Sequence, residues 1–326
     1  MIKAEEARKL VEELPRLSKK KLGLILFEKG IVQSPEIGRR LIQNVISGSD
    51  GSTKTDAYIG NNLKAGKKNN FTPYKVDGKN IGLLFDLHFP FHDKRAINVA
   101  LSYFKLKKVD TIILGGDAVD FYGFSRFMKD PKQRITPWQE LGMLAGFITD
   151  LRNNFPKAKI IWKYGNHCER FEHHVFQMTP VLADFKVLSM DHIMNHYGET
   201  DDEKEVARKR DLIIVDEKRV VKMGKLNLVH GHEFGKSIFS PVNPARGLYL
   251  RAKTNTICGH HHQTSEHIEK DLNDNVVGCW SVGCLSDLHP AYMPINKFNL
   301  GFARVVIDKE GNFSVENKKL MNYKIV

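Results

Sequence analysis

The stretch KIIWKYGNHCER, residues 159–170, joins an apolar run to a glycine and two polar residues. Such a run, rich in β-branched and aromatic residues, predicts a buried strand, and Gly165 lets the chain turn sharply where the strand ends. Asn166 and His167 are therefore expected side by side at the tip of a strand. Their meaning depends on the residues that stand at the tips of the other strands.

Predicted strands and helices alternate on both sides of this stretch. Strands are predicted at 81–86, 109–117 and 159–167, and helices at 95–108 and 137–155. A polar, charged insertion at 184–210 interrupts the alternation, and short strands predominate from residue 211 onward. This pattern predicts a layered α/β fold with buried strands.

Polar residues of three types stand at the ends of five predicted strands. They are Asp86 and His88, Asp117 and Asp120, Asn166 and His167, His230 and His232, and His260 and His262. Ligand sites in open α/β sheets lie outside the carboxyl ends of the strands. Nitrogen and oxygen donors without thiolates suit Mn²⁺, Fe or Zn²⁺. One catalytic ion uses about three protein ligands, so a set this large predicts two divalent ions that share a carboxylate and act at phosphorus.

The ordered blocks DLH, GGDAVD, GNH, HGH and GHHH resemble the signature of the calcineurin-like metallophosphoesterase superfamily. The resemblance covers roughly residues 80–310 and implies a four-layer α/β/β/α sandwich with a dinuclear site at one edge. It implies that one metal is held by Asp86, His88 and His262, the other by Asn166, His230 and His260, and that Asp117 bridges them. It also places His167 over the substrate, with Asp120 orienting it.

Three residues near these blocks need separate interpretation. Many relatives have an acidic residue directly after GNH, whereas this chain has Cys168 there and Glu169 one position later. Arg170 is a candidate for binding a phosphate oxygen, although a surface arginine at a helix start would look the same. His261 lies between two ligand positions and is expected to point away from the metals.

These residue types favour hydrolysis of a phosphate ester by metal-activated water. A metal-bound water loses its proton near neutral pH and can attack phosphorus. His167, held by Asp120, is expected to protonate the departing alkoxide as a general acid. Mn²⁺ is the expected metal.

Composition and hydropathy predict a cytoplasmic protein without a membrane partner. The 326 residues are 41% hydrophobic and 27% charged, as is ordinary for globular proteins. No apolar run approaches the roughly 20 residues that span a bilayer, and the first residues show no signal-peptide core. The four cysteines lack paired CxxC spacing and are expected to be reduced thiols.

Residues 1–47 are predicted to form a small helical bundle. Ser18 is expected to cap a helix that runs to residue 28, and Ser34 to cap another that starts at Pro35. Two helices joined by a GIVQ turn have the outline of a helix-turn-helix, which any three-helix bundle would share. Residues 48–80, rich in Gly, Ser, Asn and Lys, are predicted to be a linker, and 81–326 the catalytic domain.

The net charge of +12 is concentrated near the N-terminus, since residues 1–80 carry 16 Lys and Arg against 9 Asp and Glu. This surplus favours nucleic acid as a partner, although a solvated lysine-rich surface gives the same counts. The leading hypothesis is therefore a phosphodiesterase or nuclease acting on nucleic acid. The alternatives are a phosphatase of a phosphoprotein or small monoester, whose N-terminal helices serve oligomerisation, and a binding protein with a decayed site. The sequence leaves the oligomeric state open.

Overall fold

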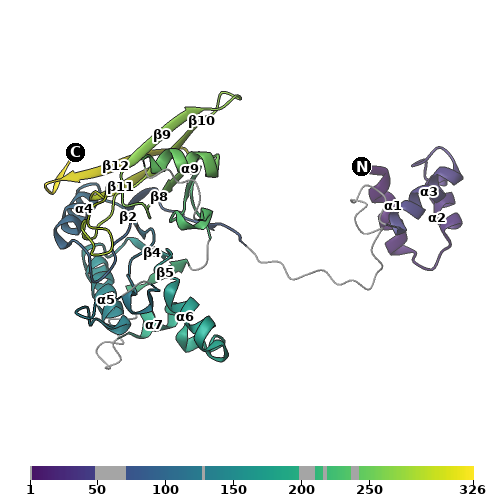
Figure 1. The fold of residues 1–326 in the computed structure, drawn as a ribbon. Helices are drawn as coiled ribbons and strands as arrows, with labels where there is room; N and C mark the ends of the chain where they lie inside the picture. Colours follow the sequence, from purple (N-terminus) through teal and green to yellow (C-terminus); the bar gives the residue numbers. More distant parts are fainter. Residues whose placement is uncertain (1, 48–70, 127–128, 198–209, 216–218, 236–241) are drawn as a thin grey trace. The chain divides into compact units, whose positions relative to one another are not determined.

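The computed structural model describes residues 2–47, 71–126, 129–197, 210–215, 219–235 and 242–326. The chain divides into two compact units, Met1–Asn70 and Phe71–Val326 (Figure 1). Most of the predicted linker, residues 48–70, lies outside the described residues. The last part of the predicted linker is described. In it, Tyr74–Lys75 forms a strand, β1, that pairs with β6 (Val221–Met223). The second unit therefore starts about ten residues earlier than predicted.

The described residues of the N-terminal unit form three helices, α1 (Ile2–Glu13), α2 (Lys19–Glu28) and α3 (Pro35–Ile46). The hydroxyl of Ser18 accepts a hydrogen bond from the Lys21 N–H, and that of Ser34 accepts one from the Ile37 N–H at 3.2 Å. Both predicted caps are confirmed. A separate hydrophobic core holds the helices together, with Ala7, Leu10, Leu22, Leu26, Val32 and Ile42 buried.

Helices α2 and α3 cross at two glycines. A Cβ atom added to Gly38 would lie 2.3 Å from the Gly23 carbonyl oxygen, and one added to Gly23 would lie 2.4 Å from the Arg39 nitrogen. No side chain fits between backbones this close, so the crossing depends on glycine at both positions.

The second unit is built on a sheet of seven strands, in the order β13-β12-β11-β2-β3-β4-β5. Its bounds are β2 (Asn80–Leu84), β3 (Thr111–Leu114), β4 (Lys159–Lys163), β5 (Leu212–Val215), β11 (Gly301–Ile307), β12 (Phe313–Met321) and β13 (Lys324–Ile325). The four strands from β2 to β5 are parallel, so their carboxyl ends lie at one edge. The predicted strands at the DLH, GGD and GNH blocks are confirmed.

A second sheet of six strands runs in the order β1-β6-β7-β8-β10-β9. Its remaining strands are β7 (Leu226–Leu228), β8 (Thr256–Cys258), β9 (Ser265–Lys270) and β10 (Val276–Ser281). Alternate residues of both sheets form one buried cluster between them, which includes Ile81, Leu83 and Ile113 on one side and Leu228, Ile257 and Trp280 on the other. The period of two along each strand produces this apolar interface.

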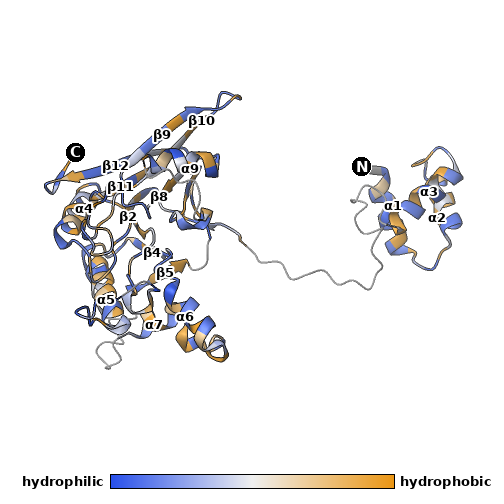
Figure 2. Cartoon of the chain, viewed as in Figure 1, coloured by the Kyte–Doolittle hydropathy of each residue, from blue (hydrophilic) through white to orange (hydrophobic). Residues whose placement is uncertain are grey.

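Helices cover the outer faces of both sheets. Helices α4 (Lys94–Leu106) and α5 (Pro137–Asn154) contribute Phe104 and Leu144 to a cluster with Ile112 and Trp162 of the larger sheet. Both helices carry hydrophobic and hydrophilic residues (Figure 2), which is typical of helices packed on one side. Helix α9 (Pro244–Ala252) packs Leu248 in a cluster with residues of the smaller sheet. The predicted four-layer α/β/β/α order is confirmed.

Several short elements lie between these layers. They are α6 (Arg170–Met178), α7 (Met190–His196) and the 3₁₀ turns η2 (Tyr122–Phe124), η3 (Pro180–Leu182), η4 (Lys186–Leu188) and η5 (His232–Phe234). The predicted insertion at 184–210 thus contains η4 and α7, and its residues 198–209 lie outside the described part. All four cysteines are free and buried. Among the described helices, none combines the length and apolarity needed to cross a bilayer.

The glycine crossing yields a test of how the N-terminal unit is held together. Gly38→Ala should destabilise this unit by about 1–3 kcal/mol, because the new methyl group overlaps the Gly23 carbonyl. Hydrogen exchange of peptides from residues 2–47 measures the loss. Gly146→Ala on α5 is the matched control, since a Cβ there meets nothing within 4 Å and should stabilise its helix by roughly 0.5–1 kcal/mol. Unchanged protection in Gly38→Ala would show that the helices do not cross in this way.

Candidate metal centre

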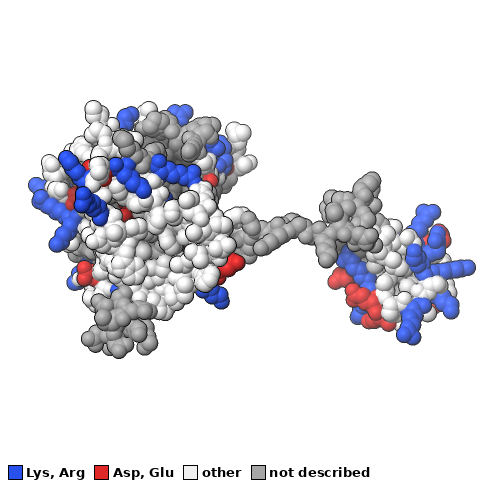
Figure 3. All heavy atoms as spheres, turned by 60° about the horizontal axis from the view of Figure 1, so that its bottom comes forward, with Lys and Arg blue, Asp and Glu red and all other residues white. Residues whose placement is uncertain are grey.

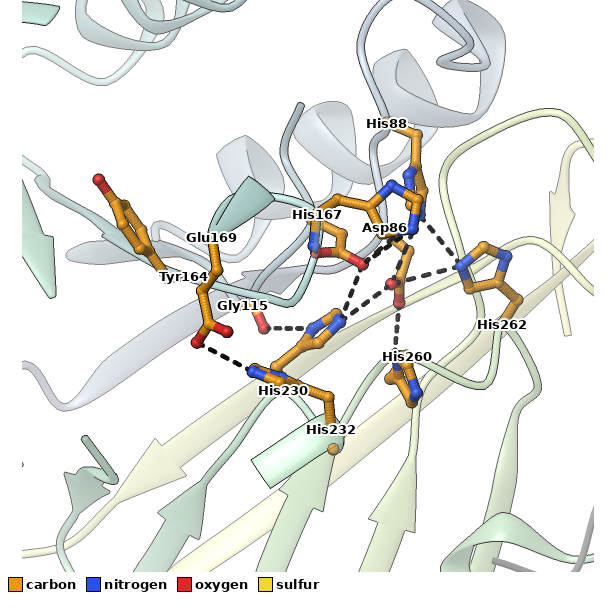
Figure 4. A network of polar contacts seen from close by, with 12 residues as sticks. Asp86, His88, Gly115, Tyr164, His167, Glu169, His230, His232, His260 and His262 are labelled. Carbon is orange, nitrogen blue, oxygen red and sulfur yellow. Dashed lines mark hydrogen bonds and ion pairs between the residues drawn. The ribbon is translucent and has the colours of Figure 1, made fainter. Parts of the chain in front are cut away.

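The predicted metal ligands come together where the carboxyl ends of strands from both sheets meet. Strands β2, β3 and β4 lead into Asp86, His88, Asp117 and Asn166, and strands β7 and β8 lead into His230, His260 and His262. Figure 4 shows His88, His230 and His262 facing Asp86 from loops of both sheets. Residues more than a hundred positions apart in the chain thus form one site.

The carboxylate of Asp86 is held by the backbone on one side and faces imidazoles on the other. Its Oδ2 accepts a hydrogen bond from the His260 N–H at 2.8 Å. Its Oδ1 lies 3.4 Å from Nε2 of His262 and 3.8 Å from Nε2 of both His88 and His230. One oxygen is therefore fixed, and the other is surrounded by nitrogen atoms that can coordinate a metal.

Asp117 is arranged in the same way. Its Oδ1 accepts a hydrogen bond from the His167 N–H at 2.8 Å. Its Oδ2 lies 3.1 Å from Nε2 of His230, 3.9 Å from that of His88 and 4.0 Å from that of His167. Asp117 thus reaches histidines from both predicted ligand sets.

These atoms divide into clusters with the spacing of metal ligands. One consists of Asp86, His88 and His262, and another of Asp117, His230 and His260, with all ligand atoms of a cluster within 4.8 Å of one another. A third set, His88, Asp117 and His167, lies between them. The first two clusters are the sets that the resemblance implied, apart from Asn166.

The donor atoms fit divalent cations. Asp86 Oδ1 and Asn166 Oδ1 are buried without a hydrogen-bond partner, which is costly unless another group satisfies them. Nε2 of His88 and Nε2 of His262, 3.2 Å apart, both face Asp86 Oδ1. A cation beside these atoms would satisfy the oxygens, and mixed nitrogen and oxygen donors suit Mn²⁺, Fe or Zn²⁺.

His230 is oriented for coordination by the strand end beside it. Its Nδ1 lies 3.2 Å from the Gly115 carbonyl oxygen, so Nδ1 carries the proton that it donates and Nε2 points at Asp117. A backbone partner of this kind fixes the ring and its tautomer in many metal sites.

Protons take the place of cations in the metal-free site. Burial by itself would raise the pKa of Asp117, but the nearby His230 and His167 outweigh it and hold that pKa well below its usual value. Burial likewise opposes charge on His230, yet Asp117 raises its pKa to about 9. The pKa of His260, buried next to protonated His230, falls to about 3. Metal ions must therefore displace a proton from His230 at neutral pH.

Close backbone packing explains the glycine of the GNH block. A Cβ at Gly165 would lie 2.3 Å from Oδ1 of Asp117. The carboxylate fits against the end of β4 because this position has no side chain. Asn166 and His167 therefore follow the end of β4, which packs directly against Asp117.

Asp120 lies beside the cluster and binds three groups. Its Oδ2 is 3.3 Å from Nδ1 of His88 and 3.4 Å from Nδ1 of His167. Its Oδ1 accepts a hydrogen bond from Arg170 Nη1 at 3.1 Å. Burial would raise the pKa of Asp120, but His167 and His88 lower it strongly. The carboxylate thus lies within reach of both His167 and His88.

Arg170, the first residue of α6, lies within the site rather than on an outer surface. Its Nη2 is 2.9 Å from Nε2 of His167, and its Nη1 also donates to the Asp120 carbonyl at 2.9 Å. The guanidinium donates to Nε2 of His167, whose Nδ1 then donates to the Asp120 carbonyl at 3.1 Å. Binding of a phosphate oxygen by Arg170 stays a prediction.

The two residues that follow the GNH block, Cys168 and Glu169, make different contacts. Cys168 is fully buried, and burial raises the pKa of its thiol to about 12, so it is a neutral core residue. Glu169 is also buried, and its Oε1 lies 3.1 Å from Nε2 of His232. Glu169, which stands one position after the acidic residue of many relatives, therefore contacts His232 of the HGH block. His261 is absent from the ligand clusters of the described residues and lines the adjoining pocket.

A buried ion pair supports His230 from behind. Lys163, at the end of β4, is fully buried, and its Nζ lies 2.7 Å from Oε1 of Glu233. Glu233 accepts hydrogen bonds from the N–H groups of His230 and Gly231, at 2.9 and 2.7 Å. Neither residue is among those predicted from the sequence, although a lysine inside a buried strand and a glutamate three positions after His230 are visible signals.

Glu140 supports the Asp120 loop and was also missed. This fully buried residue of α5 accepts hydrogen bonds from the N–H of Phe121 and, at 3.1 Å, from that of Tyr122. Burial raises its pKa to about 8. The turn that follows Asp120 is therefore tied to the helix layer.

The chain matches no protein-family model and no curated protein. Among solved structures, vacuolar protein sorting 29 from Cryptosporidium parvum is 15% identical, and the match covers 76% of this chain and 95% of that one at a TM-score of 0.40. YfcE, a phosphoesterase from E. coli, is 12% identical, with 73% and 98% covered and a TM-score of 0.32. A dimetal phosphatase from Danio rerio is 10% identical, with 71% and 93% covered and a TM-score of 0.33.

Metal binding tests the site directly. Metal-free protein should bind about two Mn²⁺ ions per chain, with affinity that rises between about pH 6 and about pH 9, because His230 with its pKa near 9 must lose a proton first. Titration calorimetry in buffers of different ionisation enthalpy measures both the stoichiometry and the protons released.

Asp117→Asn should weaken the binding of both ions, since Asp117 reaches both ligand sets. Asp184→Asn, an exposed position outside the clusters, is the matched control. A stoichiometry of one or none, or two ions bound as tightly by Asp117→Asn as by the wild type, would contradict a shared dinuclear centre.

Proposed function

We propose that this protein, whose layered fold and strand-end residues resemble those of the calcineurin-like metallophosphoesterases, hydrolyses phosphate esters with two bound divalent metal ions. The observation that carries this proposal is the pair of buried carboxylates, Asp86 and Asp117, each tied to a backbone N–H and each facing several imidazole nitrogens. When bound, the two ions would supply a water activated near neutral pH and positive charge for the phosphoryl oxygens.

The residues beside the ligands would position the substrate and move a proton. His167 lies at the pocket beside Asp117, where it can reach a phosphoryl or leaving-group oxygen. Its Nε2 accepts from Arg170 in this structure, so donation of a proton from Nε2 requires Arg170 to turn away and Nε2 first to take up a proton from solvent. An anionic phosphate would attract that guanidinium and so free Nε2, while Asp120 keeps the imidazole in place.

Nucleic acid is the substrate class that the charge distribution favours. The proposed metal is Mn²⁺, and the proposed location of the protein is the cytoplasm. The visible face of the N-terminal unit carries many Lys and Arg side chains beside a smaller acidic group (Figure 3). Helix α3 exposes Arg39 and Arg40, and both contact Glu36 in exposed pairs that contribute little to stability. Phosphate groups can therefore compete for these arginines at modest cost.

The role of His167 can be tested on diesters with different leaving groups. His167→Ala should keep its metals and lose roughly 10²–10⁴-fold in turnover of esters with alkyl leaving groups, which need protonation. Esters of p-nitrophenol should lose much less. His196→Ala, an exposed histidine of α7, is the control.

Equal losses for both leaving groups would reject general-acid catalysis and favour phosphate binding by His167. Wild-type protein with two bound Mn²⁺ ions that hydrolyses neither bis(p-nitrophenyl) phosphate nor the monoester would contradict the proposed activity. Preference for the monoester would favour the phosphatase alternative.

Removal of residues 1–70 tests the nucleic-acid hypothesis, because the second unit begins at Phe71. The truncated protein should hydrolyse small diesters at the wild-type rate but bind duplex or single-stranded DNA more weakly, with a flatter salt dependence. Arg39→Glu with Arg40→Glu should reproduce part of this loss. Reversal of two exposed lysines of the second unit, Lys309 and Lys324, is the matched control.

Gel shifts across a salt series measure both effects. DNA binding as tight as that of the full chain would contradict a role for the N-terminal unit. A changed elution volume on size exclusion with unchanged DNA binding would favour the oligomerisation alternative.

A further inference from the structure

A pocket of about 500 Å³ opens beside the metal ligands, within the roughly 300–1,000 Å³ of small-molecule sites. One side is formed by metal-centre residues, among them His88, Asp117 and His262. The other side is formed largely by one loop, residues 286–299, which contributes Tyr292, Met293, Asn296, Lys297 and Phe298. The proposed chemistry at the metals needs no such wall, so the wall is available to bind the rest of the substrate.

The loop is fixed at both ends to the segments that carry the ligands. The Asp287 N–H donates to the Phe91 carbonyl at 2.8 Å, three residues after His88. At the other end, the Asn299 N–H donates to the carbonyl of the ligand His262 at 2.9 Å. The wall therefore keeps its place relative to the metal centre.

Asn296 braces the loop internally. Its amide donates to the carbonyls of Leu288 and Met293, each at 2.7 Å, and its Oδ1 accepts from the Phe298 N–H at 2.8 Å. Binding to a wall built in advance costs less ordering of the protein.

The wall presents flat, apolar groups to the pocket. Tyr292 is 66% exposed and Met293 44% exposed, and exposed apolar groups gathered at one place are typical of a binding surface. Tyr292 lines the pocket, where burial and the charges of Asp120 and Asp86 raise its pKa to about 12. Phe298 packs against the ligand His262, with ring centroids 4.5 Å apart.

We propose that this loop binds the nucleobase of a nucleoside phosphodiester, with Tyr292 as the stacking platform while the phosphate lies at the metal ligands. This inference rests on the proposed phosphoesterase function and specifies its substrate. An exposed aromatic ring is the group on which unpaired bases stack, and such stacking is tolerant of base identity. Lys297, at the same wall, adds a positive charge suited to a neighbouring phosphate. A phosphorylated peptide or a small sugar phosphate would leave the ring uncovered.

The experiment compares two diesters with the same leaving group in the Mn²⁺-loaded protein. They are the p-nitrophenyl ester of thymidine 5′-monophosphate and methyl p-nitrophenyl phosphate, which lacks a nucleoside. The wild type should prefer the thymidine ester by about 5- to 150-fold in kcat/KM, mainly through KM, which is the range of base stacking on an aromatic ring. Tyr292→Ala should remove the preference without changing hydrolysis of the methyl ester, whereas Tyr292→Phe should keep it.

A control variant and a second measurement keep the test specific. Phe71→Ala removes another exposed aromatic ring, outside the pocket, and should behave as wild type. Calorimetry compares the affinity for thymidine 5′-monophosphate with the affinity for methyl phosphate, and this measurement needs no turnover.

Equal kcat/KM for both esters in the wild type, or a preference that survives Tyr292→Ala, would overturn base binding at this wall. If neither ester is hydrolysed but thymidine monophosphate still binds better through Tyr292, the proposed activity fails and base binding stands. Hydrolysis of both esters without preference leaves the activity intact and rejects the base subsite.

Discussion

Two buried carboxylates, Asp86 and Asp117, impose the constraint on which the rest of the structure depends. Each is almost fully excluded from water, and an unpaired buried charge costs several kcal/mol. One backbone N–H on each carboxylate offsets only part of this cost. The remainder must come from positive charge. When no metal is bound, protonated His262 beside Asp86 and protonated His230 beside Asp117 supply it, and metal ions are the natural replacement because the same nitrogen and oxygen atoms then become ligands.

The surrounding backbone is organised to hold these groups close. Five of the proposed ligands have positive φ angles, a region that residues other than glycine rarely occupy: Asp86, His88, Asp117, His260 and His262. Such conformations cost about 1–3 kcal/mol each and cluster at functional sites. The adjacent strands of two packed sheets resist relaxation. The Lys163–Glu233 pair and Glu140 tie the connecting loops to buried strands and to a helix.

The proposed chemistry and the proposed substrate binding involve different parts of the chain. The metal ligands come from strand ends, which the packed sheets hold rigidly. The pocket wall comes from a loop that is braced by its own Asn296 side chain, and the basic helices form a separate compact unit. Loops and added units can vary without disturbing the sheets, so one reaction can be directed at different substrates.

Much of the fold and of the ligand set could be predicted from the sequence, because both are written in local patterns. A buried strand shows as a short apolar run, and a ligand at its tip shows as Asp, Asn or His within a few positions of that run. Gly38, four positions after the predicted cap Ser34, gave no such signal, because its role depends on Gly23 in another helix.

Contacts between distant segments were decided only by the tertiary structure. The pairing of β1 with β6 turned part of a linker-like stretch into a strand. Lys163 is 70 positions from Glu233, and Glu169 is 63 positions from His232, so neither pair has a local pattern. The wall around Tyr292 lies more than a hundred residues from Asp117 in the chain. Sequence determines which residues can stand at the end of a strand, but only packing of the two sheets determines which of them meet, because proximity in space depends on the whole topology.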